Sequence, residues 1–177
     1  SECHKAMIDE IFKVKMDNDS IGGIIQTAIC NLPVGLGEPW FDSFEGVISN
    51  ALFSIGGIKG VEFGAGFGFA DLTGSTANDS FTYKLGKVVT KTNNSGGING
   101  GITNGMPVIF NSVVKPTPSI SKPQETIDFI NQTDATLEIV GRHDPAIIRR
   151  ICIVVTSLVA VVVCDILTQT YGKDYLN

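Results

Sequence analysis

A long apolar run, residues 151–164, limits the folds open to this chain, because only Thr156 and Ser157 in it are polar. The run is shorter than the roughly 18 to 20 apolar residues that a membrane-spanning helix needs, and Asp165 ends it. It therefore predicts a fully buried core helix and no membrane segment. Pro145 precedes the run and is expected in the first turn of that helix.

Charge and length narrow the class of protein further. The 177 residues suffice for one domain with a hydrophobic core. Thirteen Lys and Arg against eighteen Asp and Glu give a net charge of −5, which argues against nucleic acid as the main partner because phosphate binding needs clustered positive charge. The amino-terminal residues lack the apolar stretch of a signal peptide.

The cysteines argue against a metal site. Cys3, Cys30, Cys152 and Cys164 show no CxxC spacing, and the chain has two histidines, so we expect no bound metal. We expect all four thiols to be reduced, in a cytoplasmic protein. Cys152 and Cys164 lie in the apolar run and are expected to be buried as small hydrophobic side chains.

Apolar periodicity predicts two amphipathic helices, residues 3–16 and 40–53. Alternating or apolar segments predict strands at 21–30, 58–63 and 108–114, and a hairpin of 126–130 with 136–140. Residues 64–105 are mostly Gly, Asn, Ser and Thr and predict a long loop or lid. Since helices and strands do not alternate regularly, we expect an α+β fold of antiparallel sheets packed on helices.

Residues 92–105 combine glycine with asparagine, which tolerates left-handed backbone conformations. Such a backbone can turn several N–H groups inward as a nest for a phosphate or an anionic ring. The pattern is neither the dinucleotide-binding nor the P-loop motif. The residues alone leave a ligand cradle and a flexible surface loop equally open.

Two further segments concentrate polar chemistry. Residues 115–119 alternate one cation and two hydroxyls with two rigid prolines, as in a phosphate clamp, although a plain strand exit can contain proline as well. Residues 141–145 place Arg142, His143 and Asp144 before a predicted helix N-terminus, where anions are stabilised. Alternatively, Asp144 could cap a helix that begins at Pro145, and the two roles can coexist.

These segments belong to an ordered set of motifs: DSIGG, GLGEPWFD, SIGGIKGVEFG, GSTAND, TNNSGGINGGITNG, KPTPSI and GRHDP. In this order the sequence resembles the carboxy-terminal half of the chorismate synthase family. The resemblance implies that residues 1–177 are the carboxy-terminal portion of a larger domain and part of its β-α-β sandwich. Small departures are Ser95 for Ala, Ala146 for Cys, Arg149 for Pro and Thr156 for Glu.

The resemblance implies a lyase of aromatic amino-acid biosynthesis in the shikimate pathway. Such an enzyme forms chorismate from 5-enolpyruvylshikimate 3-phosphate by anti-1,4-elimination of phosphate, and it requires reduced FMN. The family's early Ser-His-Gly motif, its second catalytic histidine and its substrate-phosphate arginines have no counterpart here, so we expect the chain alone to be inactive. A cytoplasmic homotetramer is implied, and whether NADPH reduces the flavin stays open.

The family's site residues carry over by motif position. The flavin-binding residues would be Gly56, Gly57, Gly100, Lys115, Pro116, Thr117, Pro118, Ser119 and Arg142. Asp144 matches the acidic residue thought to act near flavin N5 in a proton relay. Two other classes of function stay open: a flavin- or phosphate-binding module without catalysis, and an assembly domain whose glycine-rich loop is disordered.

Overall fold

The computed structural model of the chain describes residues 2–176, and its centre is a three-stranded antiparallel sheet. The strands β1 (Gly23–Ile29), β7 (Val108–Val114) and β2 (Ile58–Phe63) lie in the order β1-β7-β2. In β7, alternate side chains are buried, as expected of a strand with one face on a core. The three predicted strands and the α+β class are confirmed.

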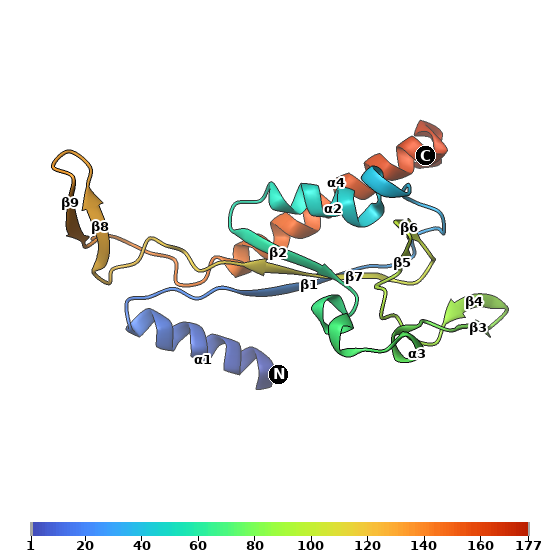
Figure 1. Ribbon diagram of the computed structural model, residues 1–177, viewed down its shortest axis with the longest axis horizontal. Coiled ribbons are helices and arrows are strands. Elements are labelled where there is room, and N and C mark those ends of the chain that lie inside the picture. Colours follow the sequence, from blue (N-terminus) through green and yellow to red (C-terminus); the bar gives the residue numbers. More distant parts are fainter. Residues whose placement is uncertain (1, 177) are drawn as a thin grey trace.

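Two helices cover one face of this sheet, α2 (Phe44–Phe53) and α4 (Ile148–Tyr171) (Figure 1). Each presents one stripe of apolar side chains at helical spacing to the core. The stripes and the strand residues beneath them are Phe44, Ile48, Leu52, Ile151, Val155, Val159, Val163, Phe110 and Val114. The core therefore lies between these helices and β7.

The prediction of a fully buried carboxy-terminal helix is wrong. α4 buries one stripe only, and Ile153, Val154 and Val161 on other faces are 67%, 46% and 66% exposed. A single sheet can cover only one side of a helix. By length and composition the 24-residue α4 could also cross a membrane, although its buried stripe packs on the sheet as a core helix does.

Two further predictions about this helix, its first residue and the burial of its cysteines, are also wrong. Pro145 is not in its first turn, because the helix begins at Ile148. Cys152 and Cys164 are exposed, because neither lies in the buried stripe of α4, and Cys152 lines an apolar groove beside β1. All four cysteines are free of disulfide bonds.

The predicted helix over residues 40–53 is two elements. A 3-10 turn, η1 (Trp40–Asp42), ends before Ser43, whose backbone is extended and whose hydroxyl accepts from the Gly46 amide at 3.0 Å to cap α2. Trp40 and Phe41 lie outside the helix and are 85% and 89% exposed. The apolar periodicity runs on across the capping Ser43, so the sequence pattern predicted a helix that is longer than α2.

The prediction of an irregular loop over residues 64–105 is also wrong. This region holds η2 (Gly66–Asp71), α3 (Gly74–Ala77), the hairpin of β3 (Phe81–Lys84) and β4 (Lys87–Thr90), and the short pair β5 (Ile98–Asn99) and β6 (Ile102–Thr103). Leu85 and Gly86 both have positive φ, 51° and 75°, which suits the twist of a two-residue hairpin turn.

A second hairpin, β8 (Gln124–Asp128) with β9 (Thr133–Leu137), projects from one end of the molecule (Figure 1). The hairpin was predicted, but its turn lies earlier in the chain. The Asp128 carboxylate accepts from the amides of Asn131 and Ile130 and so closes the turn there. Hydrogen bonds from the backbone and side chain of Asn131 and from Ile130 lower the pKa of Asp128.

The predicted first helix is confirmed as α1 (Glu2–Met16). None of its described side chains is buried, and it borders an apolar groove of about 460 Å³ shared with β1 and the start of α4. A short 3-10 turn, η3 (Lys173–Leu176), follows α4.

Candidate functional site

Three segments distant in sequence meet beyond the carboxy-terminal end of β7. The Ser20 hydroxyl donates to the Thr117 carbonyl at 2.6 Å, and the Ile21 amide donates to the Pro145 carbonyl at 2.8 Å. A Cβ on Gly22 would lie 2.3 Å from the Val114 carbonyl oxygen, so only glycine fits there. These two hydrogen bonds and the close approach at Gly22 hold residues 19–23, 115–119 and 141–145 together.

Gly56 and Gly57 lie beside the second of these segments. The Lys115 amide donates to the Gly57 carbonyl at 2.9 Å, and the Lys115 side chain is exposed. Thr117 Oγ1 is buried and has no hydrogen-bond partner among residues 2–176. A buried hydroxyl without a partner costs free energy, so a ligand atom that bonded to it would be favoured.

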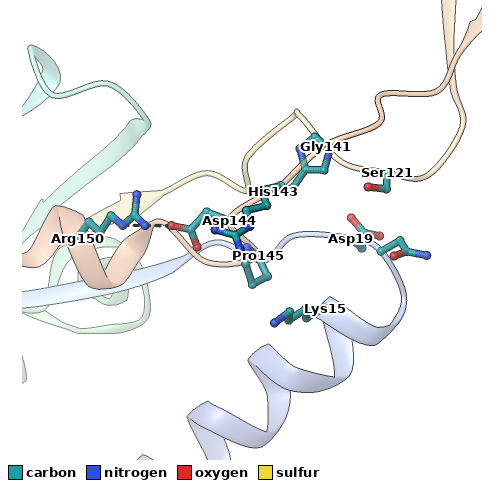
Figure 2. Close-up of a pocket in the computed structure, with 10 residues that line it drawn as sticks. Lys15, Asp19, Ser121, Gly141, His143, Asp144, Pro145 and Arg150 are labelled. Carbon is teal, nitrogen blue, oxygen red and sulfur yellow. Dashed lines mark ion pairs between the residues drawn. The ribbon is translucent and has the colours of Figure 1, made fainter.

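Asp144 does not cap α4, which corrects that prediction. Its Oδ1 accepts from the Ala146 amide at 3.1 Å, and its Oδ2 lies 3.4 Å from Arg150 Nε (Figure 2). The residue before α4 is Ile147, which makes no side-chain cap. The local turn at Ala146 delays the helix and leaves the Asp144 carboxylate 29% exposed beside a guanidinium.

A cavity of about 700 Å³ opens on this segment. Its volume is in the range of small-molecule and cofactor sites. The side chains around it come from α1, the loop before β1, the segment after β7 and the start of α4 (Figure 2). They are Lys15, Asn18, Asp19, Ser121, Arg142, His143, Asp144 and Arg150. Three of them are cations and two are carboxylates, of which Asp144 pairs with Arg150 and Asp19 with Lys122. Lys15 and Arg142 make no ion pair among the described residues, which favours an anionic ligand.

Lys15 and Arg150 were not predicted from the sequence. A signal for Arg150 was present, because a cation in the first turn of a helix opposes the helix dipole and is expected only where an anion compensates it. Lys15 carries no such signal, since α1 reaches the cavity only through the fold.

Lys122 fixes the loop before β1 against the segment after β7. Its ammonium bonds to the carboxylates of Asp17 and Asp19, the latter at 2.9 Å. The bond from Lys122 and the Ser20 amide lower the pKa of Asp19, and the two carboxylates raise the pKa of Lys122. This cation is committed to the protein and is not offered to a ligand.

The glycine-rich residues 92–105 form a nest, but its anion is internal. The amides of Asn94 and Ser95 donate to the two Asp79 carboxylate oxygens at 2.8 Å each, and the Thr92 hydroxyl donates at 2.6 Å. Burial raises the pKa of Asp79, yet the bonds from Thr92, Ser95 and Asn94 outweigh it, so its pKa lies below the ordinary value. These two amides therefore stabilise the fold by binding Asp79 and are not available to a ligand.

Gly100 lies apart from the other predicted flavin-binding residues. It occupies the turn between β5 and β6, at the opposite end of β7 from Lys115 (Figure 1). It is exposed and has a φ of 59°. Of the predicted flavin-binding residues, Arg142 lines the cavity, whereas Lys115 and the unpartnered Thr117 hydroxyl lie in the neighbouring segment after β7. Exposed cations and an unpartnered hydroxyl at this end of the sheet fit a phosphate-bearing cofactor such as FMN.

Comparison with known proteins now decides the family. The chorismate synthase family model matches residues 1–168. The chain belongs to the chorismate synthase family. It is 48% identical to the chorismate synthase of Thermococcus kodakarensis and 46% identical to that of Dehalococcoides mccartyi, with 91% and 92% of this chain and 45% and 44% of those proteins covered.

A crystal structure of chorismate synthase superposes with a TM-score of 0.74 at 32% identity, covering 97% of this chain and 43% of that one. The chain thus spans less than half the length of these relatives. The departures from the chorismate synthase motifs fit the fold. Ala146 is a small residue at a buried position, 4% exposed, and Arg149 and Thr156 are exposed.

Proposed function

We propose that the protein containing this chain is a chorismate synthase that eliminates phosphate from 5-enolpyruvylshikimate 3-phosphate to form chorismate. The observation that carries the proposal is the cavity beyond the end of β7, which the GRHDP motif lines and beside which the KPTPSI motif is held by the Ser119–His143 bond. The activity belongs to the whole protein, because the family's catalytic histidine motifs are not among these 177 residues.

In this proposal Lys115 and Arg142 bind the phosphate of FMN, since both side chains are exposed cations at the same end of the sheet, Arg142 at the cavity and Lys115 in the segment after β7. Pro116 and Pro118 hold the segment rigid, and the Thr117 hydroxyl and Ser119 contact the cofactor. Gly56 and Gly57 border it from the turn before β2, where the Gly57 carbonyl accepts from the Lys115 amide. Reduced FMN would supply electron density as the substrate phosphate leaves.

Asp144 is the proposed proton carrier. Its carboxylate faces the cavity, and its contacts with the Ala146 amide and Arg150 fix its direction. A carboxylate held in this way can accept a proton at one oxygen while the other oxygen still accepts a hydrogen bond, and the ion pair with Arg150 is restored when the proton leaves.

The proposal assigns Gly100 a contact with the flavin of a neighbouring subunit. Because it lies at the far end of β7, its flavin contact would be made to a cofactor bound by a neighbouring copy in a homotetramer. The proposal further places the enzyme in the cytoplasm, with neither membrane nor nucleic acid as a partner.

The test is a flavin titration of the whole protein, with chorismate formation measured in dithionite-reduced FMN. We expect FMN fluorescence to be quenched and chorismate to form. Arg142→Ala should weaken FMN binding by about tenfold to a hundredfold, the value of charged hydrogen bonds. Arg149→Ala is the matched control, because Arg149 does not line this cavity, and it should bind as the wild type does.

Two outcomes contradict the proposal in different ways. Quenching without chorismate formation by the whole protein would indicate a flavin-binding module. Neither quenching nor product would indicate an assembly domain.

A further inference from the structure

The imidazole of His143 is held at both of its nitrogens. Nε2 lies 3.1 Å from the Ile139 carbonyl oxygen, and Nδ1 lies 3.1 Å from the Ser119 hydroxyl. The ring is half-buried and lies at the wall of the cavity between Arg142 and Asp144 (Figure 2). It is therefore the side-chain link between the segments that carry the two motifs.

The carbonyl partner determines the direction of one bond, and the protonation of the ring determines the other. A backbone carbonyl can only accept, so Nε2 must carry a hydrogen. In the neutral imidazole Nδ1 is then bare and can only accept, which makes Ser119 the donor. The single hydroxyl hydrogen of Ser119 is used in this bond, and only the lone pairs of Oγ are left for a ligand.

We propose that His143 is a positioning residue that makes Ser119 a hydrogen-bond acceptor toward the ligand. Ser119 then selects an N–H group of a heteroaromatic ring and disfavours a phosphate oxygen, which is itself an acceptor. The cations Lys115 and Arg142 take the phosphate, and the histidine-held serine takes the ring. This inference rests on the proposed function, which places a flavin against residues 115–119.

The reverse polarity is the competing state. If His143 carried hydrogens on both nitrogens, Nδ1–H would donate to Ser119 and release the hydroxyl hydrogen toward an anion. The two states differ in one proton on one nitrogen, so a spectroscopic measurement separates them directly.

Nitrogen-15 NMR of the FMN-loaded protein at neutral pH makes this measurement, with the His143 signals identified by their loss in His143→Asn. We expect a bare, pyridine-type Nδ1 and a hydrogen-bearing Nε2. A hydrogen on Nδ1 would overturn the proposal, whatever the activity of the protein.

Two matched substitutions test the link to binding. In His143→Asn the shorter amide side chain can place its oxygen near the position of Nδ1, so it keeps an acceptor for Ser119. His143→Gln extends to the position of Nε2 and keeps only the bond to Ile139. We expect His143→Asn to bind FMN nearly as the wild type does, and His143→Gln and Ser119→Ala each to weaken it by about threefold to tenfold.

The double variant His143→Gln with Ser119→Ala should bind no more weakly than either single variant, because both remove the same bond. Equal effects of His143→Asn and His143→Gln at equal melting temperatures, or additive effects in the double variant, would overturn the positioning role. Failure of the wild type to bind FMN would instead reject the proposed function, and the NMR result would still decide the state of His143.

Discussion

The two ends of β7 carry polar segments that were both candidate ligand sites in the sequence, and they use their polar groups in opposite ways. At the amino-terminal end, the glycine-rich residues 92–105 direct backbone amides at Asp79. At the carboxy-terminal end, Lys115 and Arg142 are exposed and the Thr117 hydroxyl has no partner among the described residues. At the first end the Asp79 carboxylate takes up the amides of Asn94 and Ser95, although the buried Asn93 Oδ1 there has no partner among the described residues. At the second end exposed cations are open to a ligand.

The comparison shows that the partners of polar groups separate architecture from binding more reliably than composition does. Nearly all buried polar groups in folded proteins have a partner. A glycine and asparagine loop whose amides already meet a carboxylate has few donors left for a phosphate. A segment with unpaired cations and an unpartnered hydroxyl still has its binding capacity.

The largest expected effect distinguishes the two kinds of glycine in the closed end. Gly96 has a φ of 64°, and a Cβ there would lie 2.5 Å from the Gly64 amide nitrogen, so Gly96→Ala should destabilise the fold by about 3–5 kcal/mol. Gly100 has a similar φ of 59° but open space around it, so Gly100→Ala should cost about 1–2 kcal/mol. Urea unfolding of both variants measures the difference.

Equal losses in these two variants would mean that strain in φ alone, and not packing, accounts for both glycines. The glycine-rich end would then be less closely packed than its contacts indicate, which would break the comparison.

The next effect concerns the open end. Asp144→Asn keeps the shape of the side chain and its acceptor for the Ala146 amide but loses the basic oxygen, so turnover by the whole enzyme should fall about a hundredfold or more. FMN affinity should change little. Asp165→Asn is the control, because Asp165 is exposed on α4 and bonds to Gln169, and its turnover should be normal. Near-normal turnover in Asp144→Asn would leave only a role in the local turn.

The smallest effect probes the internal anion. Asp79→Asn keeps one acceptor oxygen and loses the charge, so the Ser95 amide loses its partner and the free energy of unfolding should fall by about 2 kcal/mol at neutral pH. Asp71→Asn, an exposed position on the same segment, should be near neutral. Chemical unfolding at several pH values measures both.

The sign of the pH dependence follows from the lowered pKa of Asp79. Its contribution to stability is complete above the ordinary pKa of aspartate and is lost as pH falls through the lower pKa of the folded state. The wild type and Asp79→Asn should therefore converge in acid. A constant difference down to the lowest pH at which the protein folds would show that Asp79 acts by shape and not by charge.

Local pattern was sufficient for much of the fold. Periodicity predicted α1, β1, β2 and β7 to within about two residues, together with the α+β class and the existence of the second hairpin. These features depend on neighbours in sequence: one apolar face at a fixed spacing, or alternation along a strand. The motif order was likewise readable, and with it the family.

What the sequence could not provide is the choice of distant partners. Ser95 and Asp79 are 16 residues apart, and Ser119 and His143 are 24 apart, so no local rule pairs them. The half-exposed α4 and the separation of Gly100 from Lys115 likewise depend on the size and direction of the central sheet. Residue types and spacing determine which polar groups exist, but only folding decides which of them meet, because each bond forms between groups that the chain brings together from far apart.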